Sequence, residues 1–98
     1  MYKTALSGAV FFAPTNARYR AYYGKVLAAD ERHRHRAEAE LQAAVKLDEQ
    51  NADYRIMLAE FFVDIKLLKR AEGELNRLLI IAPNNYEART LLDSMRKK

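Results

Sequence analysis

The residues best suited to chemistry form one basic run at positions 32–36, which reads Arg-His-Arg-His-Arg and holds both histidines of the chain. Imidazole nitrogens can bind metal ions, and arginine side chains match phosphate groups. A zinc site needs further ligands at suitable spacing and the chain has no cysteine, so we predict no metal site. Acidic residues flank the run at Asp30, Glu31, Glu38 and Glu40. They favour a solvated turn, and contact of residues 32–36 with nucleic acid or an acidic partner is the alternative.

Nothing else in the sequence has the arrangement of a catalytic centre. No serine, histidine and acid are spaced for a nucleophilic triad, and no glycine-rich phosphate loop is present. We therefore predict that the chain is not an enzyme, with no catalytic residues and no cofactor. The formal charge of +4 is modest beside 13 acidic residues, so nucleic acid is not the leading partner.

Composition indicates a small helical domain. The chain has 98 residues, half of them hydrophobic, with only three glycines and two prolines. That supplies enough apolar material for a core and few breaks for helices. No segment is long and apolar enough to span a bilayer, so we predict no membrane partner. The lack of cysteine agrees with a reducing compartment, and we predict a cytoplasmic protein.

An internal repeat must position the residues of the basic run. The segment Arg36–Leu41 reads RAEAEL and returns 34 positions later as Arg70–Leu75, which reads RAEGEL. Recurrence at this period is typical of stacked helical repeats, in which each unit buries its apolar face against its neighbours. Asn16, Asn51 and Asn85 stand in register with the repeat. We predict that they cap the helices that follow them.

The repeat predicts six helices. Apolar residues recur at steps of three and four, and Pro14 and Pro83 stop two of the helical patterns. The helices are predicted at residues 2–13, 16–29, 35–47, 51–64, 68–81 and 85–97. The first copy has one extra residue between Ala29 and Arg36, in a turn that tolerates insertion. Helices of this length are barely stable alone, so packing between them must hold the fold.

The pattern inside the repeat resembles one known family. A large residue precedes a small one in each copy, then come an alanine and a bulky apolar residue, and Pro83 closes the second copy. The matching positions are Tyr23-Gly24 with Leu58-Ala59, Ala37 with Ala71, and Leu41 with Leu75. Gly24 and Ala59 are small where we expect a neighbouring helix to approach closely. This arrangement resembles the tetratricopeptide repeat, a helix–turn–helix with a period of about 34 residues. The family's tryptophan position holds Arg20 and Arg55 here, which is a departure.

The resemblance implies an all-α, right-handed helix–turn–helix solenoid of about two and a half repeats. We interpret residues 1–98 as one domain. Its predicted parts are the second helix of a truncated repeat at 1–14, repeats at 15–49 and 50–83, and a terminal capping helix at 84–98. Sel1-like and other paired-helix repeats fit the period less well. Since both ends of the array look incomplete, we expect the segment to belong to a longer protein.

Members of the family usually bind partners on the concave face, which the first helix of each pair lines. The resemblance therefore implies a non-catalytic scaffold or adaptor for a peptide or partner protein. The candidate groove residues are Arg18, Tyr22, Lys25, Ile56, Glu60 and Thr90. Arg18 and Lys25 would contact carboxylates of the partner. The alternative is lateral pairing of Arg18 with Asp53 and of Lys25 with Glu60, which contributes about 0–1 kcal/mol for each exposed pair.

Two further hypotheses concern the partner. Phe11 or Phe12 of the first predicted helix lacks a covering neighbour, and a homodimer through the end helices is the alternative that this suggests. In that alternative the chain is the self-association module of a larger multidomain bacterial protein. The family's clamp for the acidic C-termini of heat-shock chaperones is not expected, because Ala21, Met57 and Glu60 stand where polar or basic clamp residues belong.

Overall fold

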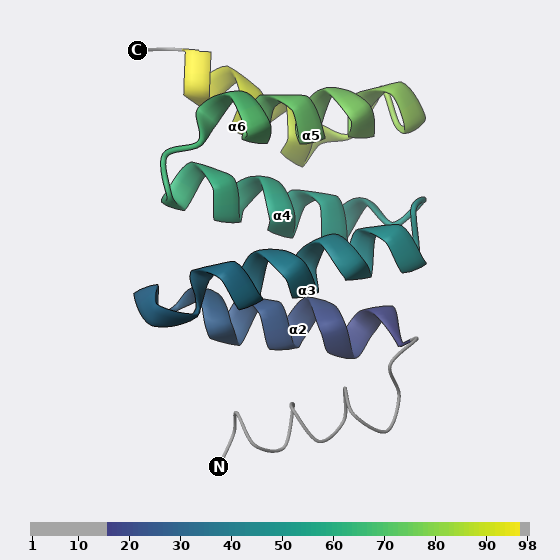
Figure 1. The fold of residues 1–98 in the computed structure, drawn as a ribbon. Helices are drawn as coiled ribbons and strands as arrows, with labels where there is room; N and C mark the ends of the chain where they lie inside the picture. The colour runs from purple at the N-terminus through teal and green to yellow at the C-terminus, as the bar shows by residue number, and fades with distance from the viewer. Residues whose placement is uncertain (1–15, 97–98) are drawn as a thin grey trace. The chain divides into compact units, whose positions relative to one another are not determined.

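The computed structural model describes residues 16–96, and this part of the chain contains helices and no strand. The elements are α2 (Ala17–Ala28), the 3-10 turn η1 (Glu31–His33), α3 (Arg34–Leu47), α4 (Ala52–Asp64), α5 (Leu68–Ile81) and α6 (Tyr86–Arg96) (Figure 1). Each α-helix begins and ends within about one residue of its predicted bounds, so the all-α prediction is confirmed. The helix predicted at 2–13 lies outside the described residues. None of the described helices is long and apolar enough to cross a membrane.

The chain forms two compact units, Met1–Tyr54 and Arg55–Lys98. In the first unit, α2 and α3 lie side by side as an antiparallel hairpin (Figure 1). The prediction that Gly24 permits a close helix approach is confirmed. A Cβ atom there would lie 2.8 Å from Cγ of Leu41 and 3.2 Å from the carbonyl oxygen of Ala37. Only a residue without a side chain fits this contact unstrained.

In the second unit, α4 continues into α5, and α6 packs on α5 (Figure 1). The largest fully buried side chains of this unit are Leu58, Leu75 and Leu78. Leu75 and Leu78 lie three residues apart on α5, as the sequence pattern predicts, and Leu58 lies on α4. All three belong to the apolar core, which these short helices need for stability.

The connections between the helices of each pair differ in length. Residues 29–33 join α2 to α3 and include η1, whereas residues 65–67 join α4 to α5. The shorter connection is a Schellman motif, in which the N–H of Leu67 donates to the carbonyl of Phe62 at 2.8 Å. Lys66 sits at its left-handed position with φ 65°. Glycine is the usual residue there because it has no Cβ to clash.

Asparagine caps begin α2, α4 and α6, as predicted. The side-chain oxygens of Asn16, Asn51 and Asn85 accept hydrogen bonds from the backbone N–H three residues later, at 3.1, 3.1 and 2.9 Å. Each cap satisfies one of the amides that the first helical turn leaves without an internal partner. The three asparagines that stand in register in the sequence therefore mark the residues at which α2, α4 and α6 begin.

The last helix has a polar outer side. Ala88 and Leu92 are buried, whereas Asp93 and Arg96 occupy repeat positions that are small or apolar in α2 and α4. The Arg96 side chain lies 3.5 Å from the Glu72 carboxylate on α5. Such a surface suits the end of a helical array, and the role of α6 as a terminal cap stays a prediction.

Candidate partner-binding face

Three of the candidate groove residues lie on one exposed face of α2. Arg18, Tyr22 and Lys25 follow one another at steps of four and three, which places their side chains on the same side of the helix. All three are exposed, and Tyr22 leaves 47% of its surface open to solvent. We call these three residues the α2 face. An aromatic ring between two cations can contact apolar and acidic groups of a partner together.

Tyr54, at the start of α4, adds a second aromatic side chain near the α2 face. Partial burial raises the pKa of the Tyr54 phenol, and Asp48 and Tyr22 add to the increase, whereas Arg18 lowers it. The phenol is therefore within electrostatic reach of two members of the α2 face. Within the described part of this unit, Arg18 and Asp53 form no ion pair and Lys25 takes part in none. The alternative in which Arg18 pairs laterally with Asp53 is therefore not seen among the described residues.

The other candidates lie in the second unit and differ in exposure. Glu60 on α4 and Thr90 on α6 are exposed, whereas Ile56 is only 6% exposed. Ile56 lies one helical turn before the buried Ala59 and forms part of the core. Its burial removes it from the residues that a partner can reach. Ala21, at the same repeat position in α2, is fully buried for the same reason.

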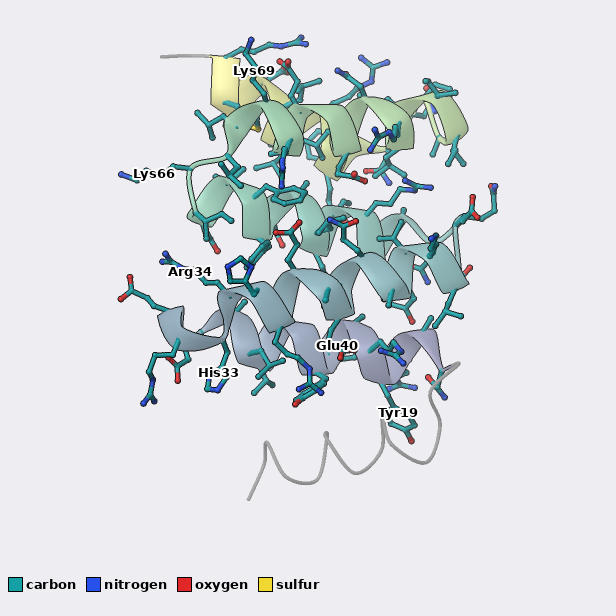
Figure 2. All side chains as sticks on the ribbon, viewed as in Figure 1. Tyr19, His33, Arg34, Glu40, Lys66 and Lys69 are labelled. Carbon is teal, nitrogen blue, oxygen red and sulfur yellow. The ribbon has the colours of Figure 1, made fainter. Side chains whose placement is uncertain are left out.

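Sequence reasoning missed a buried glutamate between two arginines in the first helix pair. Glu40 is 5% exposed, although it lies on a helix rich in charged residues (Figure 2). One carboxylate oxygen accepts a hydrogen bond from Arg20 of α2 at 2.8 Å, and the other accepts one from Arg36 at 3.4 Å. A charge this buried needs such partners, because an unpaired carboxylate would keep a large desolvation penalty. The pair therefore ties α2 to α3.

The second helix pair repeats this arrangement. Arg55 of α4 is 9% exposed, and its guanidinium lies 3.6 Å from the Glu74 carboxylate on α5. Glu74 also accepts from Arg77 at 2.6 Å. Both inter-helix pairs use equivalent repeat positions, with the arginine four residues after the asparagine cap and the glutamate inside the RAExEL segment. An arginine and a glutamate that recur together at these repeat positions were the signal in the sequence from which both ion pairs could have been predicted.

A family model of the tetratricopeptide repeat matches residues 28–95. This chain belongs to the tetratricopeptide repeat family. The predicted resemblance is thus confirmed, while a comparison with curated proteins finds no match. Tetratricopeptide repeats generally mediate protein–protein interactions, and the family is typically a non-catalytic scaffold.

The arginines at the tetratricopeptide tryptophan position now have a physical explanation. Arg20 and Arg55 replace the packing of a large ring with an ion pair to the second helix of the same repeat. Arg89 of α6 occupies this position in the third copy, and it donates instead to the backbone carbonyl of Pro83 at 2.9 Å. The departure from the family pattern is therefore a different way of joining the two helices of a repeat.

The arginine that begins each RAExEL segment lies over an aromatic ring. The guanidinium carbon of Arg36 lies 5.5 Å from the centroid of the Tyr23 ring. At the same repeat position, Arg70 lies 5.9 Å from the Phe62 ring. Each cation–π contact joins the segment to an aromatic ring on the first helix of the same repeat. The repeated segment is thus a packing element, which leaves partner contact to other surfaces.

Acidic neighbours neutralise the basic turn locally. Arg32 and His33 both lie against the Asp30 carboxylate, at 3.0 and 3.2 Å, and Arg34 lies 3.3 Å from Glu31. Hydrogen bonds from Arg32 hold the pKa of Asp30 well below its usual range. This pairing favours the predicted solvated turn, and contact of residues 32–36 with nucleic acid or an acidic partner stays the untested alternative. Residues 16–96 contain no group of three histidine or acidic side chains placed to hold a metal ion.

Proposed function

We propose that this tetratricopeptide chain is a non-catalytic adaptor that binds an acidic segment of a partner protein on the α2 face. Family membership supports protein binding in general. The choice of face rests on one observation, that the exposed Tyr22 lies between Arg18 and Lys25 and that neither cation forms an ion pair in the described part of the unit. First helices line the concave side in this family, so the proposed face is the expected one.

The geometry of the α2 face suggests what the partner carries. Arg18 and Lys25 are seven positions apart on the helix, which is a rise of about 10.5 Å. Two carboxylates at that separation, with an apolar group between them, would meet both cations and the Tyr22 ring. Each exposed pair contributes about 0–1 kcal/mol, and covering Tyr22 adds on the order of 1 kcal/mol. Binding at this face is therefore weak unless neighbouring surfaces add contacts.

Affinity capture from the native lysate tests the proposal. The double variant Arg18→Glu/Lys25→Glu is expected to lose the captured partner, because it replaces attraction for carboxylates with repulsion. The matched control Arg32→Glu/Arg34→Glu reverses the same number of charges on the basic turn. Full capture by the α2 variant would refute the proposed face. Loss confined to the control, with release of nucleic acid, would assign binding to the basic turn.

Two other measurements separate the remaining alternatives. Sedimentation at several concentrations distinguishes an adaptor from a self-association module, because a homodimer through the end helices would dissociate on dilution. Cell fractionation checks the cytoplasmic location that we assign to this function. Recovery of the chain outside the cytoplasm would contradict that assignment.

A further inference from the structure

The end of the α4–α5 connection and the start of α5 combine exposed leucines with lysines. Lys66, Leu67, Leu68 and Lys69 are consecutive and all exposed, and each leucine leaves 39% of its surface open to solvent. Lys66 and Lys69 lie at the same end of this unit (Figure 2). Turns are usually built from small and polar residues, so an exposed leucine in the turn, next to a second exposed leucine that begins α5, is unusual there. We call these four residues the KLLK turn.

Lys66 has an unfavourable backbone conformation. It is the one residue with a side chain and positive φ in the described part of the chain, at φ 65°. The N–H of Lys66 donates to Val63 at 3.0 Å within the Schellman motif, so this conformation is fixed by the end of α4. Glycine would adopt it without strain. Lysine at this position therefore makes the protein less stable than glycine would. Strained residues of this kind cluster at functional sites, so we consider a role of the Lys66 side chain in binding.

The charges of the KLLK turn are not neutralised locally. In the first unit, the corresponding connection pairs Arg32 with Asp30 and Arg34 with Glu31. Neither Lys66 nor Lys69 has an ion-pair partner in the described part of the second unit. The turn is therefore a small apolar surface with positive charge on both sides. Its chemical complement is an apolar group between two carboxylates.

We propose that the KLLK turn is a second docking surface, which binds a partner segment that carries acidic residues around leucine-like side chains. The carboxylates pair with Lys66 and Lys69, and the apolar group covers Leu67 and Leu68. A protein segment fits better than a membrane, because anionic lipid surfaces are held by clusters of roughly four to eight basic residues. This site lies on the other unit from the α2 face and does not depend on it.

Backbone amide shifts of the full chain during titration with a synthetic peptide test this proposal. The peptide reads Gly-Ser-Glu-Leu-Leu-Glu-Ser-Gly, and its control has glutamine in place of both glutamates. We expect saturable shifts at residues 66–70 and about tenfold weaker binding of the control. Lys66→Gly should weaken binding about threefold while it raises the thermal midpoint. Arg34→Gln, on the corresponding turn of the first unit, should leave the affinity unchanged.

Several outcomes would overturn the proposal. They are shifts confined to residues outside 66–70, equal affinity for both peptides, and no shift at roughly 5 mM peptide. Co-sedimentation with vesicles that contain phosphatidylserine, without peptide binding, would assign the turn to a lipid surface. Concentration-dependent sedimentation that Lys66→Gly abolishes, again without peptide binding, would assign it to a second copy of the chain. Because Lys66→Gly is expected to fold more stably, loss of binding in this variant cannot be attributed to unfolding.

Discussion

Removing Arg20 alone is expected to destabilise the first helix pair more than removing Arg20 and Glu40 together. Arg20 lies 2.8 Å from Glu40, whose side chain is only 6% exposed. In Arg20→Met the carboxylate stays buried and keeps Arg36, whose side chain is 57% exposed and lies at the longer distance of 3.4 Å. A buried charge that loses its closest partner retains its desolvation penalty without the matching attraction.

The magnitudes follow from this burial. Breaking a buried pair costs about 3–5 kcal/mol, and the remaining Arg36 contact reduces our expectation for Arg20→Met to about 2–3 kcal/mol. Glu40→Leu should cost about 1–2 kcal/mol, because the Arg20 side chain is 24% exposed and partly reaches water. The double variant Arg20→Met/Glu40→Leu replaces the pair with apolar contact and should cost about 0–1 kcal/mol.

Chemical denaturation of the four proteins in this double-mutant cycle measures the coupling. Amide hydrogen exchange in α3 reports separately on the first unit, so stepwise unfolding of the two units does not obscure the result. The sum of the two single losses less the loss of the double variant gives an expected coupling energy of about 3–4 kcal/mol. Additive free energies of unfolding, within about 0.5 kcal/mol, would refute the view that Arg20 and Glu40 stabilise the repeat as a pair.

Three more predictions concern single positions. Gly24→Ala should lower the free energy of unfolding by about 1 kcal/mol, because its Cβ would lie 2.8 Å from Leu41. Gly73→Ala meets nothing within 4 Å and should raise it by about 0.5–1 kcal/mol. An increase for both variants would contradict the close helix contact at Gly24. Lys66→Gly should raise the free energy of unfolding by about 0.5–1 kcal/mol in the same assay, and a decrease would contradict the strained backbone at this residue. Asp30→Asn should lower the thermal midpoint at pH 7. Because the pKa of Asp30 is lowered in the folded protein, the carboxylate stabilises the fold fully above about pH 4 to 5. The difference in thermal midpoint between the wild-type protein and Asp30→Asn should shrink only below that range. A difference that grows on acidification would contradict this.

Local signals in the sequence predicted most of the fold. The register of Asn16, Asn51 and Asn85 located three helix starts, because a capping side chain acts within one helical turn. The small residue Gly24 indicated a close helix contact for a similarly local reason. Side-chain exposure was harder to predict. Ile56 was assigned to a binding face by helical spacing, but the structure buries it with the core one turn before Ala59.

The buried ion pairs were missed because they join helices rather than neighbours in the sequence. Glu40 and Glu74 have the spacing of ordinary exposed helix charges, and Arg20 and Arg55 were interpreted only as departures from tryptophan. Pairing becomes visible when the second helix is placed against the first. Arg18 and Lys25 of the α2 face are exposed, as residues of a binding face must be, but spacing alone cannot identify the partner that they contact.

Photo-crosslinking from the α2 face would test the proposed function most directly. A benzophenone side chain in place of Tyr22, which is 47% exposed, should form a covalent adduct with the native partner in lysate. The same group in place of Tyr86, which is 80% exposed on the other unit, is the matched control and should give little of that adduct. Strong crosslinking from position 86 and none from position 22 would contradict the assignment of partner binding to the α2 face.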